Sequence, residues 1–578
     1  MFDRRTIIAL VFVGLILLLL PKYYELISPP KPPSPLGSDT TAVAPTADPE
    51  QPSETVQPAA KPVIQETSPV PGEGLEADTS ALIIDYVAIE TPLYRMSLSS
   101  NGMVSSYQLK EYILKTGEKV QLHLDGQKVV GSPDIDFGST NPKTIKNLRF
   151  DANKSLLSLN SGSVDSVILT AGDMRSQQVV LTYIFRAEQY GFQIAVRTEG
   201  LRVPETGEFR VKWVGGVPNT EPDPEADLRY SGAYAQVGSE LEKFQVGKDP
   251  KKEFQATGQT HFVAARSKYF MAAMIPQEPS AGVEIIGRNP APKDRGSPNY
   301  YDLVLRQNFG QAAEGRWTIY LGPIKYDELK SFGVGLDETM NWGWQIIKPF
   351  SKGVLWSLIA LHGMIPNYGL VIIIFSVLVK VILWPLTRKS QISMKKMSAL
   401  QPEIKELRET HKKNPQAMNQ AMMKLYKERG VNPVSGCIPL LFQMPILYAL
   451  FIVFSSTIEF RQSPFILWIT DLSLPDVIFH LPFSIPLYGS GVAVLPLVMG
   501  VTQFFMSKRQ VTDPNQKLMV YIMPVFMTLI FNMFPSGLTL YYTLFNVLAM
   551  VEQRLIKIPD FTPSAEVIEE KKKGKKKG

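Results

Sequence analysis

A charged side chain stands inside a long apolar stretch of this chain. Lys380 is the one charged residue between Gly369 and Leu386, and Ser376 precedes it by about one helical turn. The stretch is long and apolar enough to cross a bilayer. An ammonium group in lipid costs about 2.5–3.5 kcal/mol, so it needs a polar cavity, a partner or a route to the membrane surface. Two interpretations stay open: the Lys380 stem extends to the headgroups, or the charge serves a functional polar cavity.

Uncharged polar side chains recur in the apolar stretches that follow. Gln443 lies in one of them, and Tyr542 and Asn546 lie about one turn apart in the last. For any one of these residues, hydrogen bonding between helices is the more frequent role. If their faces converge with that of Lys380, they form a wet groove in the membrane. Such a groove would lower the cost of moving a polar peptide segment into the bilayer, and its cation would attract acidic segments. The candidate residues for such a groove are Lys380, Ser376, Gln443, Tyr542 and Asn546.

The sequence shows no set of residues typical of an enzyme. It has one cysteine, Cys437, and five scattered histidines, so an intrachain disulfide is excluded and a Cys–His metal site is not expected. Neither a glycine-rich phosphate loop nor metal-ligand spacing accompanies His123 or His261. We therefore expect no catalytic site, no metal and no small-molecule cofactor.

Six stretches are predicted to cross the membrane as helices. Every basic loop falls on one side of this arrangement, which places both termini in the cytoplasm. The first stretch could instead be a signal peptide, but it lacks a small-x-small cleavage site and Pro21 follows it, so we favour an uncleaved anchor. The predicted stretches are the anchor in residues 1–27 and the spans 367–386, 435–456, 486–506, 518–533 and 538–556.

The first half of the chain has a different composition. Residues 28–80 are rich in proline and poor in large apolar residues, which predicts an extended tether. Residues 81–335 alternate apolar and polar side chains with glycine, proline and asparagine between the runs, which predicts a large all-β periplasmic sandwich domain. Two of its runs, 179–186 and 192–197, flank a short turn that ends at Gly191 and predict a hairpin.

A short apolar segment, 349–364, precedes the second predicted span. It is too short to cross the membrane and predicts an amphipathic helix lying in the outer membrane surface. Ser351 and Lys352 are expected to lie off its apolar stripe. The stripe consists of Phe350, Val354, Leu355, Leu358 and Leu361.

Two basic segments are predicted to lie in the cytoplasm. Residues 387–430 hold eleven Lys or Arg and four Asp or Glu, and their apolar stripes predict a helical hairpin that turns at Asn414. Its methionines either give an adaptable surface for apolar segments or pack one helix on the other. The tail, 557–578, could bind ribosomal RNA or anionic lipid. Its basic residues near the end are Lys571, Lys572, Lys573, Lys575, Lys576 and Lys577.

Several short motifs follow one another in order along the second half of the chain. With them, the sequence resembles the YidC membrane protein insertases of Gram-negative bacteria over roughly residues 349–557. The motifs are Pro385-Leu386-Thr387, Leu400-Gln401-Pro402, Val431-Asn432-Pro433, Gln443-Met444-Pro445, Pro464-Phe465-Ile466-Leu467-Trp468-Ile469 and Phe534-Pro535-Ser536-Gly537-Leu538.

The resemblance implies a function as well as a fold. Members of the family have a periplasmic β-sandwich likened to sugar-mutarotase folds, and a groove open to the cytoplasm and to lipid. Lys380 stands where the family usually has an arginine, and Ser376 and Tyr542 would line the groove and touch the nascent span. The implied partners are nascent membrane proteins, the ribosome, the Sec translocon and anionic lipids.

Two other classes of protein compete with this interpretation. A small-solute transporter or channel would also use broken helices and a cation in the membrane, but many transporters show an internal repeat and none is found here. A periplasmic enzyme tethered by one helix would need recognisable catalytic carboxylates in the first half and would leave the remaining spans without a use.

Overall fold

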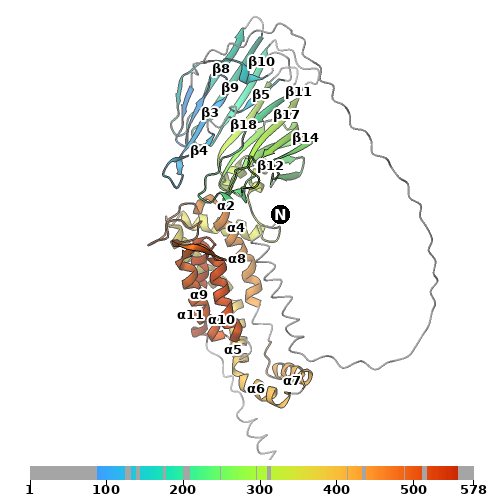
Figure 1. The fold of residues 1–578 in the computed structure, drawn as a ribbon, viewed down its shortest axis with the longest axis vertical. Coiled ribbons are helices and arrows are strands. Elements are labelled where there is room, and N and C mark those ends of the chain that lie inside the picture. The colour runs from blue at the N-terminus through green and yellow to red at the C-terminus, as the bar shows by residue number, and fades with distance from the viewer. Residues whose placement is uncertain are drawn as a thin grey trace, which may run out of the picture. The chain divides into compact units, whose positions relative to one another are not determined.

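The computed structural model describes residues 87–556 except 124–131, 138–143, 174–176, 200–207, 248, 295, 309–313, 413, 433–437, 487 and 511–516. The predicted anchor, tether and basic tail therefore lie outside the described residues, as does Cys437. Within the described part, most strands lie in the blue to green portion of the chain and the long helices in the yellow to red portion (Figure 1).

The first half forms a β-sheet domain, as its period-two pattern predicts. In the described residues it contains a 13-stranded sheet and a 5-stranded sheet, paired antiparallel except between β1 and β7. The main path of the larger sheet is β5 (Asp134–Asp136), β11 (Glu208–Trp213), β17 (Tyr300–Asn308), β16 (Ser280–Arg288), β14 (Lys251–Arg266), β15 (Phe270–Pro276), β18 (Glu314–Pro323), β10 (Phe192–Glu199), β9 (Gln177–Arg186), β8 (Val164–Asp173) and β6 (Asp151–Ala152). Beside it, β12 (Gly232–Val237) pairs with β14 and with β13 (Glu240–Phe244). The smaller sheet runs β4 (Lys119–His123), β3 (Val104–Ile113), β2 (Tyr94–Leu98), β1 (Val87–Glu90) and β7 (Leu156–Ser158).

Tyrosines join the two sheets through a shared apolar core. Tyr94 and Tyr107 belong to the smaller sheet and stack with ring centroids 4.5 Å apart. The Tyr94 hydroxyl donates to the Gly191 carbonyl at 2.7 Å, and the Gly191 N–H donates to the Tyr107 hydroxyl at 2.9 Å. Gly191 ends the predicted turn between β9 and β10, with φ of 88°, and a Cβ there would lie 2.0 Å from the Ile319 carbonyl oxygen. The predicted hairpin is therefore confirmed, and only glycine fits at its turn.

The second half is mostly helical. Helix α5 is the one described helix that is long and apolar enough to cross a membrane. Shorter apolar runs lie at 441–456, 494–508 and 520–531, so six spans stay a prediction. The helices are α4 (Lys348–His362), α5 (Tyr368–Ala399), α6 (Gln401–Thr410), α7 (Pro415–Glu428), α8 (Ile438–Ser456), α9 (Val494–Gln510), α10 (Lys517–Phe531) and α11 (Ser536–Leu555). Short helical turns occur at α2 (Pro224–Leu228), α3 (Tyr326–Ser331), η1 (Ile145–Asn147), η2 (Leu336–Thr339) and η4 (Ile458–Phe460).

One predicted helix start is wrong, and one predicted span lies in a longer helix. The span 486–506 was expected to be helical throughout, but its first residues form a turn and strand β20 (Gly489–Ala493), which pairs with β19 (Val477–Ile485). Gly489 with φ of 87° ends the turn, and an apolar run of strand length cannot be told from helix by periodicity alone. The second predicted span ends at residue 386, and the helix that contains it, α5, continues through Pro385 to Ala399 because good helix formers follow. The residue at which this helix leaves the membrane stays a prediction.

Helix α4 buries most of the face that was predicted, with differences at Ser351 and Phe350. Val354, Leu355 and Leu358 are buried as expected, and the helix packs on α5 and α8. Ser351 shares this buried face and donates to the Trp342 carbonyl at 3.2 Å, so its predicted place off the stripe is wrong. Phe350 is instead 41% exposed. A hydroxyl with a backbone partner is tolerated on a buried face, which the apolar pattern alone does not reveal.

The basic segment contains the end of α5 and then two further helices, α6 and α7. Their facing side chains form a small apolar cluster, and Glu403 accepts hydrogen bonds from Arg429 at 3.1 Å. Met397 and Met422 belong to this cluster, so these two methionines pack helix on helix. Met423 is 59% exposed and is the apolar residue left on the surface of α7. The other members are Leu400, Ile404, Leu407, Leu425, Tyr426 and Val431.

The segment between α8 and β19 contacts the β-sheet domain. Arg461 pairs with Glu221 at 2.7 Å and donates to the Ile113 carbonyl at 2.9 Å. The neighbouring Gln462 side chain donates to the same carbonyl at 3.0 Å. Both charged side chains of the pair are almost fully buried. Because breaking a buried pair is costly, this contact fastens the segment to the domain.

The neighbouring Glu459 makes the stability of the folded protein depend on pH. Burial raises the pKa of the Glu459 carboxyl to about 7, despite the nearby charge of Lys325. The folded chain therefore keeps a proton that the unfolded chain releases at lower pH, and this contribution to stability is lost as the pH rises to about 7. We expect the melting temperature of the detergent-solubilised protein to fall less between pH of about 5 and about 8 in Glu459→Gln than in the wild type. Equal falls in both proteins would contradict the assignment.

Candidate functional site

Lys380 is buried within the helical bundle and has an internal partner. Its side chain is 9% exposed, and its Nζ lies 2.8 Å from Oε2 of Glu552 on α11. The ammonium also lies 4.3 Å from the ring centroid of Phe545 on the same helix. The Lys380 charge is therefore paired inside the protein.

Glu552 is the residue that the sequence analysis missed. Its side chain is 2% exposed, and its second oxygen, Oε1, accepts a hydrogen bond from the Thr387 hydroxyl at 2.6 Å. Both of its partners lie on α5. The sequence did contain a signal, since the last apolar stretch holds an acid, Glu552, and the second holds a base, Lys380. However, the adjacent Gln553 and Arg554 made Glu552 look like part of a polar helix end.

Ser376 is buried but makes a local bond. It is 1% exposed, and its hydroxyl donates to the Ile372 carbonyl one turn earlier at 2.7 Å. Serine in a helix often bonds in this way when no other partner is present. Ser376 therefore shares the buried side of α5 with Lys380 without contacting Glu552 directly.

Two further predicted residues connect other helices to α11. Gln443 on α8 donates from Nε2 to the hydroxyl of Tyr541 at 3.0 Å. Asn546 donates from Nδ2 to the hydroxyl of Thr502 on α9 at 3.4 Å. The predicted Tyr542 instead packs on Phe531 of α10, with ring centroids 5.3 Å apart. The aromatic hydroxyl that meets Gln443 thus belongs to the preceding residue.

Helix α11 is therefore the element on which the polar groups of the bundle meet. It bonds to α5 through Glu552, to α8 through Tyr541 and to α9 through Asn546. It also packs on these helices along its length. Among the described residues, several buried polar atoms on these helices have no hydrogen-bond partner within the protein. They are Gln443 Oε1, Gln503 Oε1, Asn546 Oδ1 and Gln553 Nε2. Such groups take part in hydrogen bonding with water or a polar ligand when one reaches them.

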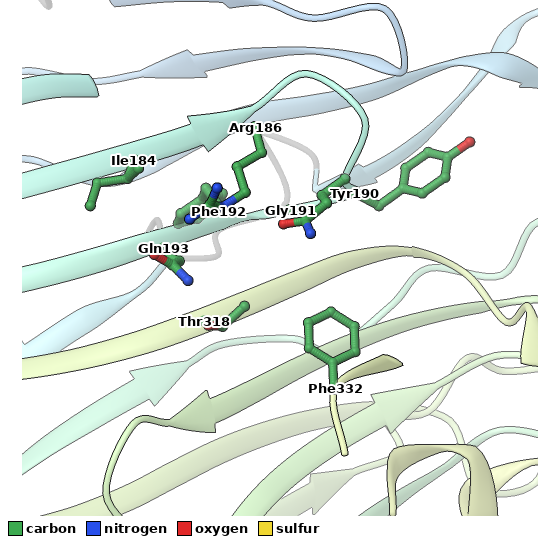
Figure 2. Close-up of a pocket in the computed structure, with 9 residues that line it drawn as sticks. Ile184, Arg186, Tyr190, Gly191, Phe192, Gln193, Thr318 and Phe332 are labelled. Carbon is green, nitrogen blue, oxygen red and sulfur yellow. The ribbon is translucent and has the colours of Figure 1, made fainter. Parts of the chain in front are cut away.

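A small pocket in the β-sheet domain has no catalytic constellation. It lies where β9 and β10 meet β18, and Arg186 is its one charged lining residue (Figure 2). Acid–base catalysis on a sugar would need positioned carboxylates or histidine, and the lining residues include neither. The lining residues are Ile184, Arg186, Gln189, Tyr190, Gly191, Phe192, Gln193, Thr318 and Phe332. In the described residues no group of histidine, cysteine and carboxylate side chains has the geometry of a metal site.

Comparisons with known proteins match both halves of the chain. The family model described as the YidC periplasmic domain matches residues 86–353, and that of the 60Kd inner membrane protein matches residues 360–561. The membrane protein insertase YidC of Pelodictyon phaeoclathratiforme is 35% identical over 540 residues, which cover 88% of this chain and 90% of the relative. That of Chlorobaculum tepidum is 32% identical over 577 residues, covering 95% and 94%. A crystal structure of active YidC insertase with its first transmembrane domain resolved is 19% identical, covers 82% of this chain and 93% of its own, and has a TM-score of 0.35.

These matches define the class of protein. A mostly β-sheet periplasmic domain followed by an inner-membrane helical domain is the arrangement of bacterial membrane protein insertases. The two relatives, both named membrane protein insertase YidC, are matched over 90% and 94% of their length. The chain belongs to the YidC family of membrane protein insertases. Family membership confirms the resemblance and sets aside the transporter and the tethered enzyme.

Proposed function

We propose that this protein moves apolar segments of nascent membrane proteins into the inner membrane along the polar side of α11. The observation that carries this proposal is the Lys380–Glu552 pair, which is buried between α5 and α11. In this proposal the six predicted spans cross the membrane, both termini lie in the cytoplasm and the β-sheet domain is periplasmic. Lys380, Ser376, Gln443 and Asn546 then belong to a groove that accepts the polar flank of the client.

Energetics favour a functional role for the charge pair. Desolvating two ions costs several kcal/mol each, and replacing such a pair with apolar residues of similar size is often neutral or stabilising. A helical bundle has no need of this pair for stability. A cation and an acid in the membrane are instead useful where polar peptide groups must pass, because unpaired groups in hydrocarbon cost several kcal/mol.

The driving force comes from the client itself. A client helix of about 20 apolar residues gains free energy when it leaves water for lipid. The step that limits this transfer is the passage of the polar flank, whose backbone and charges must leave water. The partnerless polar atoms of Gln443, Gln503, Asn546 and Gln553 are placed to bond that flank. The proposed mechanism uses no covalent chemistry, nucleotide or cofactor.

The basic segments suit the delivery side of this process. The α6–α7 hairpin is fastened by Glu403 and Arg429 and leaves Met423 exposed, which suits contact with an apolar segment. We include the ribosome, the Sec translocon and anionic lipids as partners on the strength of the resemblance and of the basic tail.

Removal of the terminal lysines tests the role of the tail. A chain ending at residue 570 is expected to co-sediment less with ribosomes at low salt, because phosphate contacts by lysine are lost. The same comparison at high salt serves as the control, since wild type and truncation should then bind alike. Equal binding at low salt, with reduced binding to anionic vesicles, would assign the tail to lipid instead.

Insertion into liposomes tests the proposed function itself. A short single-span client is synthesised with liposomes that contain only this purified protein, and insertion is read as protease protection. We expect protection well above that of empty liposomes. A matched control carries Glu240→Gln on an exposed strand of the β-sheet domain and should insert as well as the wild type. If the client is not protected although the protein is folded, the proposal that this protein inserts clients without a translocon is overturned.

A further inference from the structure

The two-stranded sheet between α8 and α9 is unusually apolar. Strands β19 and β20 and their turn, which we call the apolar hairpin, run from Val477 to Ala493 without any Asp, Glu, Lys or Arg. Three of its large apolar side chains, Ile478, Phe479 and Phe483, are 50–61% exposed. In the described residues, the apolar hairpin forms a sheet of its own.

The apolar hairpin is fixed to the helices at its base. The buried Asn532, just after α10, donates to the carbonyls of Tyr488 and Gly491 at 2.8 and 2.6 Å and accepts from the Ala493 N–H at 3.0 Å. Asp476, just before β19, accepts from the Leu495 N–H at 2.8 Å, at the start of α9. With these four hydrogen bonds, the exposed aromatic residues are held at a set height relative to α9 and α10.

An isolated hairpin of this composition is not suited to water. Two-stranded sheets are marginal in water, and soluble proteins guard exposed strand edges with charges. The apolar hairpin has no such charges. The apolar hairpin cannot lie in the hydrocarbon core of the membrane either, because the unpaired N–H and C=O groups at its strand edges are not tolerated there. The headgroup region satisfies both requirements, since it solvates backbone groups and favours aromatic side chains.

The surroundings of the apolar hairpin point to the same location. Asp476 accepts from the indole of Trp468 at 3.0 Å, which ties the apolar hairpin to a loop whose Leu467 is 82% exposed. The same loop segment contacts the β-sheet domain through Arg461 and Glu221. Because that domain matches a periplasmic family model, this end of the bundle faces the periplasm.

We propose that the apolar hairpin lies in the periplasmic headgroup region of the inner membrane, with Ile478, Phe479 and Phe483 directed into lipid. Lipids of the outer leaflet of the bilayer cover these exposed side chains. By its bonds to Asn532 and Asp476, the apolar hairpin sets the depth of α9 and α10, and therefore the height at which Asn546 and Thr502 meet. The proposal concerns lipid contact and does not depend on the charge pair.

Site-specific fluorescence tests this location in the full chain. Cys437 is replaced by serine, and a single cysteine at Phe483 carries an environment-sensitive dye in proteoliposomes of phosphatidylethanolamine and phosphatidylglycerol. A cysteine at the exposed Glu240 of β13 is the water control, and one at Val381 on the exposed side of α5 is the lipid control. Each variant must first insert the single-span client as the Cys437→Ser parent does.

We expect the dye at position 483 to be quenched by shallow nitroxide lipids and about threefold less by aqueous iodide than the dye at position 240. The dye at position 381 should respond to deeper nitroxides. Iodide quenching at 483 equal to that at 240 would overturn the proposal. Protection from iodide that develops only when a client or another membrane protein is added would overturn it in favour of a protein partner.

Discussion

Replacement of Lys380 by alanine is expected to abolish insertion and to destabilise the helical bundle by about 3–5 kcal/mol. The variant leaves the Glu552 carboxylate buried, with the Thr387 hydroxyl as its remaining bonded partner. Removing one member of a buried pair costs more than the pair contributes, because the other charge stays desolvated. Thermal unfolding in detergent and protease protection in proteoliposomes measure the two effects separately.

A double variant separates stability from function. Lys380→Met with Glu552→Gln removes both charges and keeps the volume close to that of the wild type, so much of the lost stability should return. If the charge pair serves insertion, the double variant folds but still inserts poorly. Full insertion by the double variant would reduce the pair to a structural contact. Lys380→Arg keeps the charge and is expected to insert nearly as well as the wild type.

The parts of the fold with one strong period could be predicted from the sequence. The turn at Gly191 lies between two runs of period two, and β9 and β10 form there. The α6–α7 hairpin follows two helical stripes that meet in one cluster. The conformation of the apolar hairpin was not predicted, because an uncharged run in a membrane protein is compatible with both strand and helix. Its conformation is set by three bonds to Asn532, which is distant in sequence.

The candidate site was predicted in part for a related reason. Lys380 stood out because a charge in an apolar run has a large energetic cost that the sequence alone reveals. Which group compensates that cost depends on how α11 is rotated about its axis. Neighbouring residues of a helix point in different directions, so Tyr541 meets Gln443 whereas Tyr542 packs on Phe531. Glu552 was missed because its neighbours are polar, although the structure turns it toward α5 and leaves it 2% exposed. Sequence identifies the charge, while packing identifies its partner.

Replacement of Glu552 by glutamine is expected to change which clients insert. In the wild type, an acidic residue of a client must displace Glu552 before it can bind Lys380, since the two side chains already lie 2.8 Å apart. Glutamine keeps the shape and a bond to Thr387 but removes the competing charge. The freed ammonium should favour clients with acidic flanks over clients with neutral flanks, and each 1.4 kcal/mol of released competition corresponds to about a tenfold change in this ratio.

The measurement compares three clients that differ only in one flanking residue, which is acidic, neutral or basic, in liposomes that contain wild type or Glu552→Gln. We expect the ratio of acidic to neutral insertion to rise and the basic client to insert less. Thr387→Val is the matched control, because it removes the other bond of Glu552 without changing any charge, and it should leave the ratio unaltered. An equal fall for all three clients would show that Glu552 only supports packing. In that case Glu552 and the acidic residue of a client would not compete for Lys380.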